Sequence, residues 1–183
     1  MASRDLSYRC VVGVAATLAV VGQATSSGMA ASTLKGGAIN GITVVRSVES
    51  FEATSTVFKD IPGAVATINV PAGQTWIALG RFSSETLCGS FAAEQVGGYC
   101  PMQIVSVKDG VVTSWNPDAE YDFAASAVEV AGVANWKATS FSRSTTLKGP
   151  GKYTVKVQIT VSSAGIISTV DDWQMEIMTA PKL

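Results

Sequence analysis

The chain has 183 residues, 47% of them hydrophobic, with 13 basic residues, 14 acidic residues and no histidine. This length suits one domain with a sizeable core, and the near-zero charge excludes the clustered basic face that nucleic acids or anionic membranes require. The absence of histidine excludes Ser-His-Asp and Cys-His catalytic sites and removes the commonest metal ligand.

The first 30 residues have the layout of a secretory signal peptide. Arg4 and Arg9 precede an apolar run from Cys10 to Val21, and small residues follow. An uncleaved membrane anchor is the alternative, but the run is shorter than the roughly 20 residues that span a bilayer. We therefore expect cleavage after Ser26 or after Ala30 and a secreted protein that no longer contacts the membrane.

The expected mature chain has a simple organisation. Residues 31–41 are glycine-rich and predict a flexible arm, and residues 42–183 predict a single domain. From Ala31 onward the chain carries 11 basic and 13 acidic residues, so removal of the signal peptide does not create a basic surface.

Everything after the arm predicts short strands and turns. The clearest strand is Tyr153–Val161, where apolar and polar residues alternate through nine positions. This alternation predicts a half-buried antiparallel strand whose core-facing residues are Tyr153, Val155, Val157, Ile159 and Val161. Gly149-Pro150-Gly151, directly before it, predicts a turn.

The same reasoning predicts the remaining strands. They are Ile42–Val48, Thr56–Lys59, Ala64–Val70, Thr75–Phe82, Met102–Val107, Val111–Trp115, Tyr121–Ala125, Asn135–Ser142 and Trp173–Ile177. The turn Pro71-Ala72-Gly73-Gln74 predicts a hairpin between its two flanking strands, and Asp109-Gly110 predicts another. The expected fold is all-β: an antiparallel, jelly-roll-like β-sandwich of about eight to ten strands.

Two cysteines bracket the glycine-rich stretch between the fourth and fifth of these strands. Once the signal peptide and Cys10 are removed, Cys88 and Cys100 are left in an oxidising compartment, where such a pair forms a disulfide. A bridge closing a loop of this length stabilises the fold by about 3 kcal/mol. A zinc or redox site is the alternative, but the spacing is not CxxC and two thiolates do not make a structural zinc site.

An acidic run follows Asn116-Pro117. Asp118, Glu120 and Asp122 alternate along it, so their carboxylates can converge on a hard cation in a loop. Calcium is therefore the candidate cofactor for these three residues. The alternative is a solvated acidic turn, because the glycine and distal glutamate of an EF-hand loop are missing.

Aromatic side chains supply the other candidate contacts. Trp76 and Trp173 lie inside strand patterns and are expected in the core, whereas Trp115 and Trp136 lie near strand ends and are expected at the surface, where they could bind a ligand. In the cysteine loop, Phe91 and Tyr99 are further candidate ligand contacts.

A carboxylate pair is the remaining route to catalysis, as in glycosidases. The candidate acids are Glu85, Glu94, Asp118, Glu120, Asp122, Asp171 and Asp172, and their spacing singles out no two that would face each other. We therefore expect no enzymatic activity.

An ordered set of motifs spans about residues 65–178. The motifs are RFSSETLCGS, GGYCPMQIVSVKDG, NPDAEYDF, NWKATSFSRS, GPGKYTVKVQ and DDWQMEI. In this set the chain resembles short exported bacterial proteins of unassigned function that pair an "ARFS…C" strand with a "GYC" strand and end in "GPGTYTV" and "DDW". The resemblance implies an exported β-sandwich, and its motifs are strand edges, turns and a bridge.

The sequence thus predicts a secreted, non-catalytic binding or assembly module. It would present loops, including residues 88–100, to a protein or glycan partner, or pack as a subunit, including with copies of itself. The first alternative is a carbohydrate-binding module, either with or without a calcium requirement, and the second is a carboxylate-pair hydrolase.

Overall fold

The computed structural model of the chain describes residues 36–90, 98–117 and 136–183. The predicted signal peptide, residues 31–35 of the predicted arm and the predicted strand Tyr121–Ala125 lie outside these residues. Within the described residues all regular structure is β-strand, and they include no helix of the length and apolar character needed to cross a membrane.

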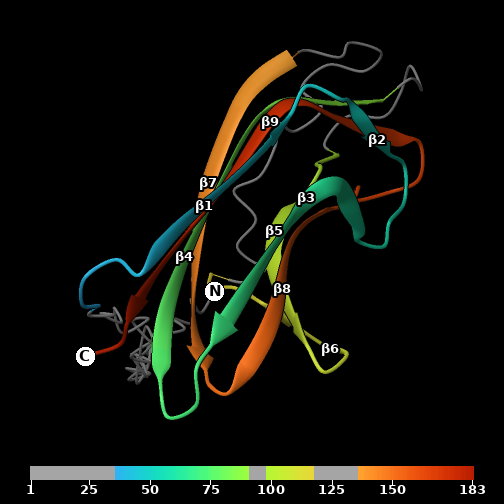
Figure 1. The fold of residues 1–183 in the computed structure, drawn as a ribbon. Coiled ribbons are helices and arrows are strands. Elements are labelled where there is room, and N and C mark those ends of the chain that lie inside the picture. The colour runs from blue at the N-terminus through green and yellow to red at the C-terminus, as the bar shows by residue number, and fades with distance from the viewer. Residues whose placement is uncertain (1–35, 91–97, 118–135) are drawn as a thin grey trace, which may run out of the picture. The chain divides into compact units, whose positions relative to one another are not determined.

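Nine strands make up the described part of the chain (Figure 1). They are β1 Gly41–Ser47, β2 Phe51–Ala53, β3 Lys59–Val70, β4 Thr75–Ser90, β5 Met102–Lys108, β6 Val111–Ser114, β7 Trp136–Lys148, β8 Gly151–Ile159 and β9 Ile166–Pro181. Of the predicted strand Thr56–Lys59, only Lys59 belongs to a strand, and β2 was not predicted.

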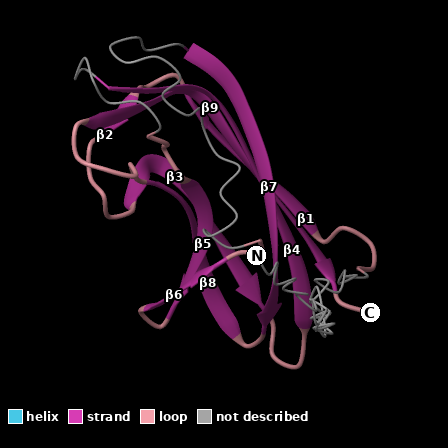
Figure 2. Ribbon diagram, turned by 180° about the vertical axis from the view of Figure 1, so that it is seen from behind, coloured by secondary structure: helices cyan, strands magenta, loops and turns pink. Residues whose placement is uncertain are grey.

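The strands form two antiparallel sheets that pack together (Figure 2). The five-stranded sheet has the order β1-β9-β4-β7, with the short β2 also paired to β9, and the four-stranded sheet has the order β3-β8-β5-β6. Every connection between the eight longer strands, except that between β5 and β6, crosses from one sheet to the other. This is the order of a jelly roll, so the predicted sandwich is confirmed.

The core lies between the two sheets. As predicted, Tyr153, Val155, Val157, Ile159 and Val161 are all buried there. Aromatic rings pack together in this core. The centroid of the Phe82 ring lies 5.9 Å from that of the Phe141 ring and 6.0 Å from that of the Trp173 ring. Trp173 is therefore a core residue, as expected.

One predicted hairpin is confirmed and one is wrong. β5 and β6 pair around Asp109-Gly110, and both residues have a positive φ, as a type I′ turn requires. β3 and β4 do not pair, because β3 pairs with β8 and β4 with β7 and β9. The turn Pro71-Ala72-Gly73-Gln74 instead carries the chain from one sheet to the other.

A second inter-sheet turn packs against the first. Gly149 and Pro150 link β7 to β8, and the Gly149 amide donates a hydrogen bond of 2.9 Å to the Gln74 carbonyl. A Cβ atom on Gly149 would lie 1.7 Å from the Pro71 carbonyl oxygen. Glycine at position 149 therefore lets the two backbone turns touch.

The described end of the predicted arm is anchored. The Gly37 amide donates to the Pro181 carbonyl at 2.8 Å, and the Asn40 amide donates to the Thr179 carbonyl at 2.7 Å. Residues 36–40 therefore continue the contact of β1 with the end of β9.

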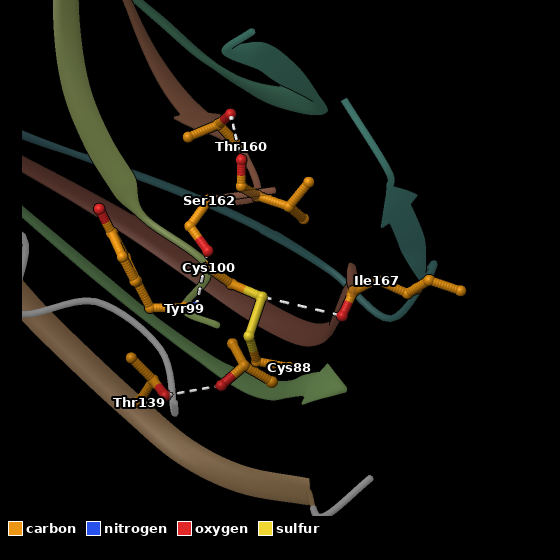
Figure 3. The surroundings of a disulfide bond; sticks show 9 residues. Cys88, Tyr99, Cys100, Thr139, Thr160, Ser162 and Ile167 are labelled. Atoms are coloured by element: carbon orange, nitrogen blue, oxygen red, sulfur yellow. Dashed lines mark hydrogen bonds between the residues drawn. A yellow bond between two sulfur atoms is a disulfide. The ribbon is translucent and has the colours of Figure 1, made fainter. Parts of the chain in front are cut away.

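The predicted disulfide between Cys88 and Cys100 is present, and Figure 3 shows its surroundings. β4 continues beyond the predicted end at Phe82 to Ser90, so Cys88 lies within β4 rather than in a loop. Cys100 lies two residues before the start of β5 in the other sheet, and its Cα atom is 5.9 Å from that of Cys88. The bridge therefore joins the two sheets, and both sulfur-bearing residues are buried.

Candidate functional site

The structure separates the predicted aromatic contacts. Trp136 is 50% exposed and Tyr99 is 53% exposed, as expected for surface residues, whereas Trp115 is only 1% exposed. Phe91 lies outside the described residues, as do the predicted calcium ligands Asp118, Glu120 and Asp122.

The expectation that Trp115 is a surface contact is wrong. Its amide donates to the Ile104 carbonyl at 2.9 Å, so the pairing with β5 continues one residue past β6. Strand alternation then turns the indole inward. The ring fits beside Gly80, where a Cβ atom would approach the indole to 3.0 Å.

The outer face of the five-stranded sheet carries charged and polar side chains that can bind a ligand. Ala78, Phe82 and Thr86 of β4 are fully buried, so the even-numbered residues of this strand point inward and the odd-numbered residues point outward. Strand pairing aligns Arg81 with Glu176 and Ser83 with Gln174. We call this set the polar half of the outer face: Arg46, Arg81, Ser83, Glu85, Ser140, Asp171, Asp172, Gln174 and Glu176.

Two shallow depressions lie in the polar half. One, of about 500 Å³, is lined by residues of β4, β7 and β9 that include Arg81, Glu85 and Ser140. The other, of about 490 Å³, is lined by residues of β1, β9 and the segment after β1 that include Arg46 and Glu49. Both are lined by Asp172 and Gln174, so together they form one surface across four strands.

A β-bulge in β9 shapes the middle of this surface. Ser83 pairs with Gln174 and Glu85 with Asp171, so two residues of β9 lie opposite the single residue between Ser83 and Glu85 on β4. The extra residue is Asp172, whose φ is 43°. Its amide donates to the Asp171 Oδ1 atom at 2.9 Å.

The bulge changes which residues of β9 face the core. Before it, even-numbered residues such as Val170 are buried, and after it odd-numbered residues such as Trp173 and Met175 are buried. Both carboxylates, Asp171 and Asp172, are therefore left on the outer side. Without the extra residue, one-residue slippage would turn Trp173 toward solvent.

Substitutions at Asp172 should separate backbone strain from side-chain function. Asp172→Gly is expected to keep or raise the free energy of unfolding, by up to about 1 kcal/mol, because glycine adopts a positive φ without steric conflict. Asp172→Val is expected to lower it by about 1 kcal/mol or more, because a β-branched residue resists this conformation. Urea denaturation of both variants checks the difference, and a greater loss for glycine than for valine would contradict this account of the bulge.

Hydrogen bonds between neighbouring strands hold the polar half in place. The Arg81 Nε atom donates to the Ser140 Oγ atom at 3.2 Å, and the hydroxyls of Ser83 and Ser140 lie 3.1 Å apart. The Gln174 Nε2 atom donates to the Glu176 Oε1 atom. These contacts position donors and acceptors side by side before any ligand arrives.

Two of the predicted acids face each other here. Glu85 of β4 and Asp171 of β9 are direct cross-strand partners, and such pairs place their Cβ atoms about 4.5–5.5 Å apart. The sequence alone names both acids as candidates but does not pair them. They lie 86 positions apart in the chain, and this spacing does not reveal which strand residues become cross-strand partners. Among the described residues, no three acidic or cysteine side chains converge on a point that could hold a metal ion.

Trp136 borders the same surface. It pairs with Leu87 at the start of β7, and the alternating residues Ala138 and Ser140 point the same way as its indole. Trp136 is therefore about 7 Å along the strand from Ala138, which lines the first depression.

Tyr99 lies elsewhere. Its amide donates to the Ser162 Oγ atom at 3.0 Å, and its ring is directed away from the sulfur atoms of the disulfide (Figure 3). It lines neither depression. The structure therefore does not bring the two exposed aromatic candidates into one site.

Sequence reasoning missed several residues of the polar half, namely Arg46, Arg81, Ser83, Ser140 and Gln174. A signal for them existed in the polar residues at every second position of RFSSE and ATSFSRS. Alternation identifies an outward face, but it does not identify which strands lie side by side on it.

The outer face of the four-stranded sheet carries a different polar arrangement. Lys156 Nζ lies 2.6 Å from Asp60 Oδ2, and Gln158 Nε2 donates to Asp60 Oδ1 at 2.7 Å. Gln103 Nε2 donates to Gln158 Oε1 at 2.8 Å, and Ser114 Oγ donates to Gln103 Oε1 at 2.9 Å. We place the candidate site on the five-stranded sheet, because its outer face carries the two depressions that share Asp172 and Gln174.

This chain of hydrogen bonds makes stability depend on pH. Burial raises the pKa of the Asp60 carboxyl, but hydrogen bonds from Lys156 and Gln158 and the charge of Lys156 outweigh it, leaving the pKa below its ordinary value of 3.8. A carboxyl with a lowered folded-state pKa contributes stability above its unfolded-state pKa, and this is lost as pH falls through the folded-state pKa.

Asp60→Asn is therefore expected to lower the free energy of unfolding at pH 7 by about 0.5 kcal/mol, a small value because the side chain is partly exposed. The deficit should shrink below pH 3.8 and vanish below the folded-state pKa. Urea denaturation across this range, with Lys156→Gln and the double variant, measures the coupling. A deficit that persists at the lowest pH would show that the ion pair is not its source.

Comparisons with known proteins give no family. No family model matches the chain, and no curated protein matches it. Among solved structures, the chain is similar to one from infectious bursal disease virus, Gt strain, with a TM-score of 0.38 and 12% identity over 96% of this chain and 40% of that one. The chain thus spans about two fifths of the length of that viral chain.

Two other solved structures are less similar. The CBM22-1 xylan-binding domain of Paenibacillus barcinonensis Xyn10C gives a TM-score of 0.29 and 9% identity over 75% of this chain and 82% of that one. Latent PorU from Porphyromonas gingivalis gives 0.26 and 13% identity over 81% and 14%. Since all these scores are below 0.5, they carry no argument about this chain.

Proposed function

We propose that this chain is a secreted, non-catalytic binding module that holds a glycan on the polar half of its five-stranded sheet. The observation that carries the proposal is the surface across β1, β9, β4 and β7, with Trp136 exposed at its border. The proposed contact surface is thus a sheet face rather than the loops expected from the sequence.

The chemistry of the surface supports a hydroxyl-rich ligand. Sugar hydroxyls both donate and accept hydrogen bonds, and the polar half offers guanidinium donors, carboxylate acceptors and a side-chain amide that does both. Open depressions across neighbouring strands suit an extended chain better than a small enclosed molecule. Trp136 offers an amphipathic ring on which a sugar can stack.

The disulfide supports export. A buried bridge between Cys88 and Cys100 is typical of proteins that fold in an oxidising compartment. Intact-mass analysis of the exported protein tests this part of the proposal. We expect a chain that begins after Ser26 or after Ala30, with the mass of two hydrogen atoms missing; a full-length chain with free thiols would contradict it.

Glycan-array screening tests the ligand class. We expect binding to one group of glycans, measured with and without a chelator of divalent cations. Binding that disappears with chelator would favour the calcium-dependent alternative, in which Asp118, Glu120 and Asp122 hold the ion. Silence on the array under both conditions would overturn the glycan proposal.

Two aromatic variants test the location of the site. Trp136→Ala is expected to weaken binding to the array-identified glycan about tenfold, because it removes the stacking ring at the border of the surface. Tyr99→Ala is the matched control, since Tyr99 is similarly exposed but its backbone is bound to Ser162, outside the polar half. Calorimetric titration measures both. A loss with Tyr99→Ala and none with Trp136→Ala would move the site from the polar half to the surface around Tyr99.

The facing carboxylates Glu85 and Asp171 favour one second candidate, the carboxylate-pair hydrolase. Incubation of the array-identified glycan with the protein, followed by measurement of released reducing ends, distinguishes it from a binding module. We expect no release. Release that is abolished by both Glu85→Gln and Asp171→Asn would establish the hydrolase instead.

A further inference from the structure

The four edge strands of the sandwich differ in how they are guarded. Natural edge strands avoid pairing with other chains by lysines, prolines, bulges or short length. β3 carries Lys59, Pro62 and a break in register, and β6 has only four residues. β7 ends in Lys148 and is bridged at Ser144 to Asn116.

β1 has only one guard of this kind, the charged residue Arg46 near its end. Its seven residues, Gly41–Ser47, contain no lysine or proline and pair with β9 in a continuous register. Four consecutive residues, Ile42 to Val45, are β-branched and favour an extended strand. Among the described strands, β1 pairs only with β9, so alternate backbone amides and carbonyls of β1 point away from β9 and pair with no described strand.

Two of the three outward side chains of β1 are apolar. Ile42 is 61% exposed and Val44 is 53% exposed, and both are on the outer face of the five-stranded sheet. Strand pairing places Met178 and then Leu79 next to Ile42 in the same row. An exposed apolar row that ends at a weakly guarded edge is typical of a surface that another strand covers.

We infer that the strand covering this edge is β1 of a second copy of the chain, paired antiparallel about a two-fold axis at Val44. This register overlaps all seven residues of both strands and places Val44 against its own copy. Arg46, the one charged residue of β1, lies opposite Ile42 of the second copy, so no like charges face each other. The self-complementarity of the strand is why we choose a second copy as the occupant.

The pairing would join the two five-stranded sheets into one continuous sheet. The polar halves of both copies would then lie on the same side, so two ligand-binding surfaces would face one way. Because only one short strand from each copy meets at the axis, the interface is small and the dimer should dissociate on dilution. The inference does not depend on the proposed ligand, since it concerns backbone pairing at β1.

Disulfide trapping tests the geometry directly. In a Cys10→Ser background, Val44→Cys is expected to form a covalent dimer under mild oxidation, because directly opposite Cβ atoms lie about 4.5–5.5 Å apart. Val112→Cys is the matched control, since Val112 is 57% exposed on the edge strand β6 of the other sheet. Equal cross-linking of both variants would mean random collision and would overturn the inference.

Sedimentation analysis of the full chain over a range of concentrations tests the dimer in solution. We expect the mass to rise toward that of two chains, and Val44→Lys to weaken association at least tenfold because two lysines would face each other at the axis. Val65→Lys, at a 44% exposed site on β3, should leave association unchanged. A single-chain mass at every concentration, or equal effects of both lysines, would overturn the inference while leaving the glycan-array result untouched.

Discussion

Gly149→Ala is expected to lower the free energy of unfolding by about 3 kcal/mol or more. The added methyl group would lie 1.7 Å from the Pro71 carbonyl oxygen and 2.7 Å from the Pro71 carbonyl carbon. Both atoms belong to backbone, so relief requires one inter-sheet turn to move away from the other. Overpacking of side chains costs about 1–3 kcal/mol, and a backbone conflict exceeds that range.

The hydrogen bond from the Gly149 amide to the Gln74 carbonyl makes the effect larger, because moving the turns apart also breaks this bond. Urea denaturation followed by tryptophan fluorescence measures the loss. Gly41→Ala is the matched control, since a Cβ atom there meets nothing within 4 Å; we expect a change within about 0.5 kcal/mol. Equal stability of the two variants would show that the turns do not need to touch.

Removal of the disulfide is the second large effect. The double variant Cys88→Ala/Cys100→Ala is expected to lose about 2–4 kcal/mol of unfolding free energy, because the bridge restricts a loop that is free in the unfolded chain. Both residues are buried, at 3% and 0% exposure, so the variant also loses packing between the sheets. Urea denaturation of the oxidised wild type and of the variant measures the difference.

The burial of the bridge gives an independent check. A reductant should reach the sulfur atoms only when the protein opens, so reduction of the wild type should become faster as urea approaches the unfolding midpoint. Rapid reduction in the absence of urea, or a variant as stable as the wild type, would contradict the structural role assigned to the Cys88–Cys100 bridge.

These two predictions concern opposite ends of β4. Gln74, which binds Gly149, directly precedes Thr75 at the start of the strand, and Cys88 lies near its end. The two sheets of the sandwich are therefore joined at both ends of β4, which belongs to the five-stranded sheet. A jelly roll needs such joints because most of its connections cross between sheets and leave few local hairpins to hold the layers.

Several features could be predicted from the sequence because they depend on neighbouring residues alone. The alternation in Tyr153–Val161 decides which side chains face the core, since successive residues of a strand point to opposite sides. Asp109-Gly110 determines its own turn, because both residues accept a positive φ. The two cysteines left after the predicted signal peptide predict their own pairing.

Other features could not be predicted locally. The turn after Val70 has the same sequence signal whether its flanking strands pair with each other or belong to different sheets. For this reason the sequence predicted a hairpin there, and that prediction was wrong. Trp115 is buried because Gly80, far away in sequence, leaves room for its ring. The residues Asp171 and Asp172 do not by themselves indicate a β-bulge. The bulge at Asp172 is needed because Val170 and Trp173 are both buried, and a regular strand would place these two residues on opposite faces.

The sequence by itself thus determined most of the described strands, the inward face of Tyr153–Val161, one tight turn and the disulfide, each of which follows from residue type and short-range spacing. Only the tertiary structure decided that Arg81, Glu85, Ser140, Asp172 and Gln174 share one surface. The physical reason is register: β4, β7 and β9 meet through backbone hydrogen bonds that any sequence can form, so which side chains become neighbours depends on how the two whole sheets pack.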